Sequence, residues 1–272
     1  HAQISGMDAL KLIRRTNGKE VLIYADPPWD VAQQGARGAG QHYDLMTLDR
    51  IKQMPVADLA GVVYSSGKVF DGLSTGRLDT ENFLRTGSLD GVASRADLAL
   101  LEDLRDAAQF VIDHASHRID AGFVRAINAT ITRSGALHPG QLRTQDQAIG
   151  VTTPYGRHSP DAVTEDQLQI LLDNATRSPE AEENALDLFI NLAKAQPFED
   201  GNKRTAVFVA NSLLIGADAG VLLTIPVDDH DPGVARAFND LLARAYLYNE
   251  HEAVKTLLRR GGLTQISRDV RH

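Results

Sequence analysis

The sequence contains no cysteine, a single tryptophan and only 6% aromatic residues. Without cysteine the chain forms neither disulfides nor thiolate metal sites, and an intracellular, cytoplasmic location fits best. No apolar run approaches the ~20 residues of a membrane span, so we expect no membrane association. Acidic residues outnumber basic ones, and the formal net charge of -8 argues against broad nucleic-acid binding, because such binding requires a basic surface.

Helical periodicity of apolar residues dominates the later two thirds of the sequence. Ser94 is expected to cap the start of one helix, and Thr164 with Gln167 has the capping-box pattern at the start of another. Ser178 followed by Pro179 predicts a third helix start, with serine as the N-cap and proline at the first helical position. The pattern favours a mostly α fold.

One loop between two apolar helical patterns carries the chemistry; it reads Gln196-Pro197-Phe198-Glu199-Asp200-Gly201-Asn202-Lys203-Arg204. Gly201 and Asn202 tolerate left-handed backbone, so successive amides there can converge on an anion. They also stand at the start of the next helix, whose unpaired amides and dipole favour phosphate. Lys203 and Arg204 add cationic donors.

Two acidic residues of the same loop, Glu199 and Asp200, supply the hard oxygen ligands that Mg²⁺ prefers beside phosphate. The residues therefore indicate a phosphate site with a divalent cation. Taken alone, they fit equally well an ordinary helix–loop–helix connection with a glycine cap and solvated charges.

The loop resembles the signature of Fic/Doc proteins, which reads His-Pro-Phe, two residues, then Gly-Asn-Gly/Lys-Arg. The segment His138–Arg143 with Ile149-Gly150, and the segment Leu222–Pro226, also resemble parts of that family. The resemblance implies a Fic-type helical bundle with a short β-hairpin flap. It also implies transfer of AMP from ATP, with Mg²⁺, to a hydroxyl of a target protein that the flap, Thr152–Arg157, would align by strand pairing.

The resemblance assigns roles to individual loop residues. Asp200 would hold the metal, with the neighbouring Glu199 as a weaker candidate. Gly201 and Asn202 would cradle the phosphates, and Arg204 would bind the outer ones. Lys203 would complete the nucleotide-binding set.

Three positions depart from the family pattern. Gln196 stands where the family has a general-base histidine; a carboxamide cannot take the hydroxyl's proton, and general-base catalysis is worth roughly 10²–10⁴-fold. No nearby histidine offers an obvious replacement. Lys203 stands where many members have glycine; the Doc branch, which resembles a variant that transfers the terminal phosphate, has lysine there. Val207 stands where AMP-transferring members usually have a second arginine.

Many Fic proteins are held inactive by a helix with Ser/Thr, three residues, then Glu-Gly or Glu-Asn, whose glutamate pairs with the motif arginine. The segment Ser65–Gly72 lies where an N-terminal inhibitory helix would be, and Asp71 would be its acid. Aspartate is one methylene shorter and the serine spacing differs. An exposed turn with an acidic residue is the alternative interpretation.

The N-terminal part has a second motif, Asp26-Pro27-Pro28-Trp29, after the strand-like run Val21–Ala25. Residues 21–60 resemble the front of DPPW-type adenine methyltransferases, in which this motif holds a flipped adenine. The likeness stops near Ala60, and Fic-like sequence occupies the place of the S-adenosylmethionine-binding part. We interpret the stretch as a small irregular fragment; a structural strand with a Pro-Pro turn is the alternative.

Four segments are therefore expected. Residues 1–60 form the methyltransferase-like fragment, 61–125 an N-terminal helical region with a degenerate inhibitory segment, 126–262 the Fic core with C-terminal helices, and 263–272 a tail.

The sequence leaves several functions open. The first is AMP transfer, weakened by Gln196 and with Asp200 and Arg204 in catalytic roles. The alternatives are an inactive module that binds nucleotide or a partner, a Doc-like phosphotransferase, and an adenine methyltransferase, which is least favoured. An antitoxin-like partner, as in toxin–antitoxin pairs, is a further expectation.

Overall fold

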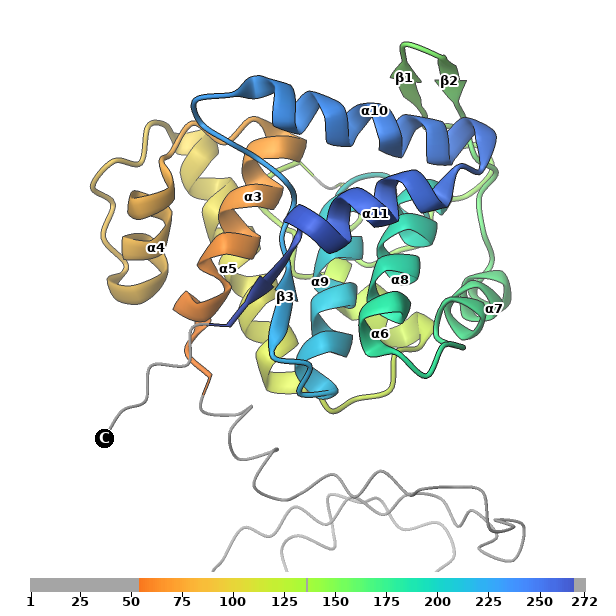
Figure 1. Cartoon of the computed structure of the whole chain (residues 1–272), viewed down its shortest axis with the longest axis horizontal. Coiled ribbons are helices and arrows are strands. Elements are labelled where there is room, and N and C mark those ends of the chain that lie inside the picture. Colours follow the sequence, from red (N-terminus) through yellow and green to blue (C-terminus); the bar gives the residue numbers. More distant parts are fainter. Residues whose placement is uncertain (1–53, 136, 267–272) are drawn as a thin grey trace, which may run out of the picture. The chain divides into compact units, whose positions relative to one another are not determined.

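A buried helix, α9 (Asn202–Gly216), lies at the centre of the described structure and packs against four helices and one strand (Figure 1). The structure is a computed structural model that describes residues 54–135 and 137–266, all within one unit of the chain, residues 43–272. The sequence of α9 is apolar on nearly every face, which is the pattern of a helix enclosed by protein.

Helices surround α9 on several sides. Its neighbours are α8 (Ala181–Ala195), α5 (Arg95–His114), α3 (Ala60–Asp71), α6 (Ala121–Asn128) and strand β3 (Val221–Leu223). Further out lie the 3-10 turn η3 (Val56–Leu59), α4 (Arg77–Thr86), α7 (Glu165–Ala175), α10 (Pro232–Tyr248) and α11 (His251–Gly261). The expected mostly α fold is confirmed.

Two short antiparallel strand pairs complete the described structure. β1 (Val151–Thr153) and β2 (Gly156–His158) form a hairpin with Thr152 opposite Arg157. β3 pairs with β4 (Leu263–Gln265), with Leu222 opposite Thr264. The hairpin lies where the sequence predicts the flap.

Helix starts test the capping predictions directly. Ser94 accepts a hydrogen bond from the Asp97 amide, and Thr164 forms a reciprocal capping box with Gln167, so both predictions are confirmed. The prediction for Ser178 is wrong, because α8 begins at Ala181 with Glu180 as its N-cap. The amide and carbonyl of Ser178 instead bond the Asn184 side chain, and this contact holds the serine outside the helix.

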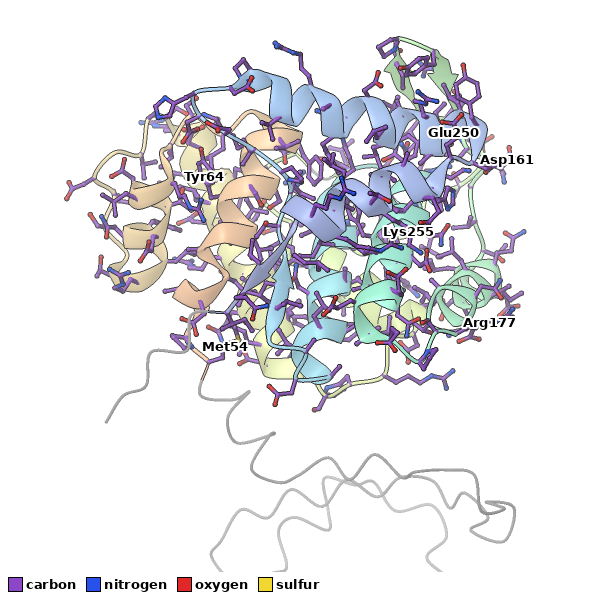
Figure 2. The ribbon with its side chains drawn as sticks, in the orientation of Figure 1. Met54, Tyr64, Asp161, Arg177, Glu250 and Lys255 are labelled. Carbon is purple, nitrogen blue, oxygen red and sulfur yellow. The ribbon has the colours of Figure 1, made fainter. Side chains whose placement is uncertain are left out.

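Polar contacts join elements that are distant in sequence. Lys255 on α11, labelled in Figure 2, lies 2.8 Å from Asp187 and 3.0 Å from Glu183, both on α8. Tyr64 on α3, also labelled there, donates its hydroxyl to Asp229 in the segment before α10. Between residues 54 and 266, no helix combines the length and the hydrophobicity that a bilayer crossing requires. The Asp26–Trp29 motif lies outside the described residues.

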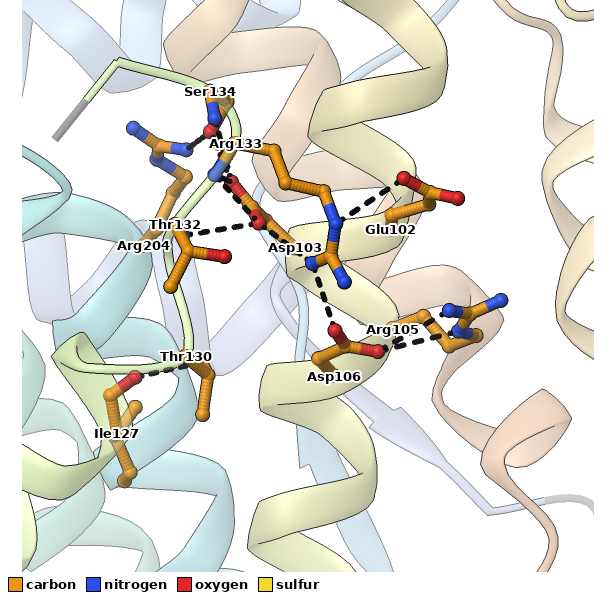
Figure 3. Close-up of polar contacts among 10 residues, drawn as sticks. All are labelled: Glu102, Asp103, Arg105, Asp106, Ile127, Thr130, Thr132, Arg133, Ser134 and Arg204. Carbon is orange, nitrogen blue, oxygen red and sulfur yellow. Dashed lines mark hydrogen bonds and ion pairs between the residues drawn. The ribbon is translucent and has the colours of Figure 1, made fainter. Parts of the chain in front are cut away.

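A buried carboxylate fixes the loop after α6 (Figure 3). Asp103 on α5 is fully buried and accepts hydrogen bonds of 2.8 to 3.1 Å from the backbone amides of Thr132, Arg133 and Ser134. The Ser134 hydroxyl adds a fourth donor at 2.7 Å. Burial favours the neutral carboxyl, but these hydrogen bonds outweigh it and hold the pKa of Asp103 below its usual range.

Replacing Asp103 with alanine should lower the free energy of unfolding by about 2–3 kcal/mol, because several partly buried donors lose their acceptor. Denaturant unfolding measures this loss. Since the folded pKa is depressed, the stabilisation is present above the unfolded-state pKa of about 3.9 and is lost as the pH falls through the folded value. The two proteins should therefore converge in stability in acid.

Asp106 provides the matched control, because it lies on the same helix, is partly exposed and bonds Arg133 at the surface. Asp106→Ala should change the stability by less than about 1 kcal/mol. Equal losses from both substitutions would contradict the role given to Asp103.

Candidate phosphate-binding site

The motif loop is a closed turn between α8 and α9. Gln196 ends α8 in the left-handed conformation, with φ of 46°, and Gly201 precedes α9 with φ of 73°. Between them, the Asn202 side chain pairs with both the amide and the carbonyl of Phe198, each at 2.8 Å. The Phe198 ring is buried and anchors the turn in the core.

Gly201 is required at its position for two reasons. Its positive φ disfavours any side chain, and a Cβ there would lie 2.7 Å from the Ile131 Cδ1. Asn128 supports the same turn from α6, donating to the Asp200 carbonyl and to the Thr205 hydroxyl, both at 3.1 Å. The backbone around the glycine is thus held by the core rather than by a ligand.

The start of α9 offers free backbone donors. The amides of the first helical turn, 202–204, have no intrahelical acceptor, and the N-cap glycine has no side chain that could supply one. They border a hollow of about 190 Å³ that is lined by Gln196, residues 199–204, residues 149–151, and Phe70 with Asp71. Ligand pockets usually measure 300–1,000 Å³, so the hollow fits phosphate groups rather than a whole nucleotide.

Arg204 is buried beside this hollow and every side of its guanidinium is engaged. Its Nε lies 3.4 Å from Asp71, one terminal nitrogen lies 3.2 Å from Asp200, and the other donates to the Ser134 hydroxyl at 2.5 Å (Figure 3). The predicted inhibitory acid and the motif arginine are therefore brought together. Asp71 ends α3 and is not in an exposed turn.

The electrostatic environment shifts the ionisation of two residues here. Burial raises the pKa of Asp71, which Arg204 opposes and the nearby Asp200 carboxylate reinforces. Burial also lowers the pKa of Lys203, which Asp71 partly offsets. The Lys203 ammonium lies 4.9 Å from the centre of the Phe70 ring, a cation–π contact that holds it at the hollow.

The donor set fits a magnesium ion that is completed by phosphate. The side chain of Asp200 is 43% exposed. Its Oδ2 pairs with Arg204, and its Oδ1 accepts a hydrogen bond from the Gly201 amide at 2.7 Å. Mg²⁺ typically binds one or two carboxylates together with substrate phosphates and water. Among the described residues no three His, Cys, Asp or Glu side chains gather into a metal site, so such an ion would depend on phosphate oxygens.

Two departures from the family pattern have clear positions in the structure. Gln196 is buried and borders the hollow, where it places a carboxamide and no titratable group. Val207 is fully buried in the core, so this position provides no phosphate ligand.

The β1–β2 hairpin adjoins the hollow, because Val151 of β1 is one of its lining residues. Tyr155 at the hairpin tip donates to Asp240 of α10 at 2.6 Å. In the described part of the chain β1 pairs with β2 alone, which leaves its other edge available for an added strand.

Sequence reasoning missed the surroundings of Glu199. Its carboxylate lies 2.6 Å from His138 Nδ1 and accepts from the Gln147 amide, also at 2.6 Å. A histidine therefore lies beside the motif, contrary to the expectation that none is near. His138 belongs to a segment that already resembled the family, but 61 residues separate it from its partner.

Comparison with known proteins finds similar sequences and folds. The model of the Fic/DOC family matches residues 118–214. None of the curated protein sequences matches the chain. A Fic domain containing signaling protein from Bacteroides thetaiotaomicron is similar in structure, with 16% identity, a TM-score of 0.55, and coverage of 79% of this chain and 88% of that one.

Fic-1 (residues 134–508) from C. elegans has 18% identity and a TM-score of 0.56 over 80% of this chain, which spans only 64% of that chain. BepC protein of Bartonella tribocorum with bound AMPPNP has 16% identity and a TM-score of 0.39. The first two structures share the fold of the described residues. Residues 118–214 thus match the sequence pattern of the Fic/DOC family, and the described part of the chain has the fold of solved Fic proteins.

Proposed function

We propose that this protein binds ATP with Mg²⁺ and transfers AMP to a hydroxyl of a target protein, slowly in its present form. One observation carries the proposal. The free amides at the start of α9, Lys203, Arg204 and the Asp200 carboxylate border a single phosphate-sized hollow. Groups of this kind stabilise the charge that develops during phosphoryl and nucleotidyl transfer.

Each group has a definite task in such a transfer. The α9 amides and Lys203 would hold the phosphates, and Asp200 would hold the metal ion, which when bound neutralises phosphate charge. The hydroxyl reaches the phosphorus from the hairpin side of the hollow, past Val151. Gln196 can hydrogen-bond that hydroxyl but cannot accept its proton, so turnover by the usual route is slow.

Transfer of the terminal phosphate is the second candidate, and the position of Lys203 favours it. The lysine lies at the hollow over Phe70. A bulky cation at this point alters how a triphosphate can lie along the helix start. The third candidate is a module that binds nucleotide, or an antitoxin-like partner, without turnover; Gln196 favours it.

Asp71 is the proposed inhibitory residue. It occupies Arg204 Nε, which an incoming phosphate would otherwise contact. Phosphate binding at this donor therefore requires that α3 release Arg204.

ATP binding in the presence of Mg²⁺, measured by calorimetry, tests the site. Lys203→Met keeps the packing on Phe70 and removes the charge, so we expect at least a tenfold loss of affinity, about 1.4 kcal/mol. Lys68→Met on α3 is the matched control and should leave the affinity unchanged. Equal affinities of wild type and Lys203→Met would place the nucleotide elsewhere.

Labelling of lysate proteins with α-³²P-ATP or γ-³²P-ATP tests turnover and separates the two transfers. Gln196→His restores a base at the hollow and should raise the rate about 10²–10⁴-fold. Label from the α position indicates AMP transfer and label from the γ position indicates phosphate transfer. If Gln196→His binds ATP but labels nothing, the binding module is the correct interpretation.

Asp71→Asn should raise the affinity for ATP about three- to tenfold at neutral pH, because Arg204 then loses its charged competitor. Burial raises the pKa of Asp71, so protonation sets in above the usual range and frees Arg204 as the pH falls. The affinity ratio between variant and wild type should therefore shrink in acid. Asp113→Asn on the remote face of α5 is the control, and a ratio independent of pH would contradict this competition.

A further inference from the structure

Three carboxylates border the hollow, and they differ in their pairing partners. Asp71 and Asp200 both pair with Arg204, at 3.4 and 3.2 Å. Glu199 pairs with no lysine or arginine in the described structure, and its partners are the Gln147 amide and the His138 imidazole. Of the three, it is the carboxylate whose negative charge no cation of the motif offsets.

The side chain of Glu199 is held in one orientation. The Gln147 carbonyl oxygen accepts from the Thr144 amide at 2.7 Å, so its NH₂ group must face Glu199 Oε1. The other oxygen, Oε2, faces His138 Nδ1. Both partners come from the segment that leads into the flap, so the carboxylate is fixed between the motif and the side from which a target approaches.

The imidazole of His138 connects this carboxylate to solvent. The His138 side chain is 50% exposed, whereas that of Glu199 is 22% exposed. Glu199 therefore borders the hollow, and its partner His138 lies at the surface. Carboxylates serve as proton acceptors in phosphoryl transfer, where positioning of the nucleophile matters more than high basicity.

The geometry points to Glu199 as the proton acceptor that replaces the missing motif histidine, with His138 and Gln147 as its positioning residues. The inference rests on the proposed function. The acceptor oxygen forms a bond to phosphorus of ATP as the bond to the leaving group, pyrophosphate or ADP, breaks. The hydroxyl proton passes to the Glu199 carboxylate, and the bonding electrons of the broken P–O bond stay with the leaving group.

Glu199→Gln tests the assignment because it keeps the shape of the side chain and the hydrogen bond from Gln147 but cannot accept a proton. The assays are ³²P transfer from ATP to lysate proteins and ATP hydrolysis with water as acceptor. We expect both rates to fall about 10²-fold or more, with ATP affinity within twofold by calorimetry. Glu182→Gln, an exposed residue at the start of α8, is the control and should match wild type.

The same substitution in a Gln196→His background separates catalysis from structure. A histidine at 196 supplies a base of its own, so Glu199→Gln should then cost less than about tenfold. Such non-additivity is expected of two groups that perform one task. An equal loss in both backgrounds, or a wild-type rate in Glu199→Gln alone, would overturn the assignment.

His138→Leu and His138→Asn together test the positioning role. Leucine cannot donate to Glu199 Oε2 and should lower the transfer rate with ATP affinity unchanged, whereas asparagine can still donate and should retain most of the rate. Asp71, Asp200, Lys203 and Arg204 also border the hollow and are unchanged in both variants.

A loss of rate in His138→Leu that His138→Asn largely restores supports the positioning role. A wild-type rate in His138→Leu would exclude His138 from the mechanism. Wild type that binds ATP but neither transfers nor hydrolyses it would overturn the inference and leave the binding module. Absence of ATP binding would remove the proposed function itself.

Discussion

A buried guanidinium organises the site of this protein. Arg204 is 2% exposed, and a buried charge is tolerated only when it is paired and hydrogen-bonded. Asp71, Asp200 and Ser134 meet that requirement from three different segments. The pairing therefore ties the end of α3 and the loop after α6 to the start of α9. It also sets up competition, because the groups that stabilise the arginine occupy the donors that phosphate would use.

The support behind Arg204 extends into the core. Ser134 is held by Asp103, whose carboxylate gathers three successive backbone amides, and Asp103 sits on a helix that packs against α9. Asn128 performs a similar task on the other side of the motif turn. Because these contacts use buried side chains with satisfied partners, the core holds the motif turn in place. In the proposed function, regulation would act through Asp71, which reaches Arg204 from α3.

The sequence predicted local structure well from local signals, but it did not predict long-range contacts. The capping box at Thr164 and the glycine before α9 depend on neighbours within a few residues, so their chemistry is readable from the chain. The prediction that Ser178 caps a helix failed because the Asn184 side chain binds the amide and carbonyl of Ser178 and holds it outside the helix. Glu199 and His138 are 61 residues apart in the sequence, and no local pattern around either residue predicts their contact.

The balance of charge around the hollow constrains how a polyphosphate can enter. Asp71, Glu199 and Asp200 face two cations, Lys203 and Arg204, so the site carries an excess of one negative charge when all five are ionised. A triphosphate would be repelled unless positive charge came with it or negative charge were withdrawn. In the proposed function, a divalent cation on Asp200 would provide the first route, and withdrawal of Asp71 with α3 would provide the second. Nucleotide binding, metal binding and release of Asp71 would then be coupled through the charge balance of the hollow.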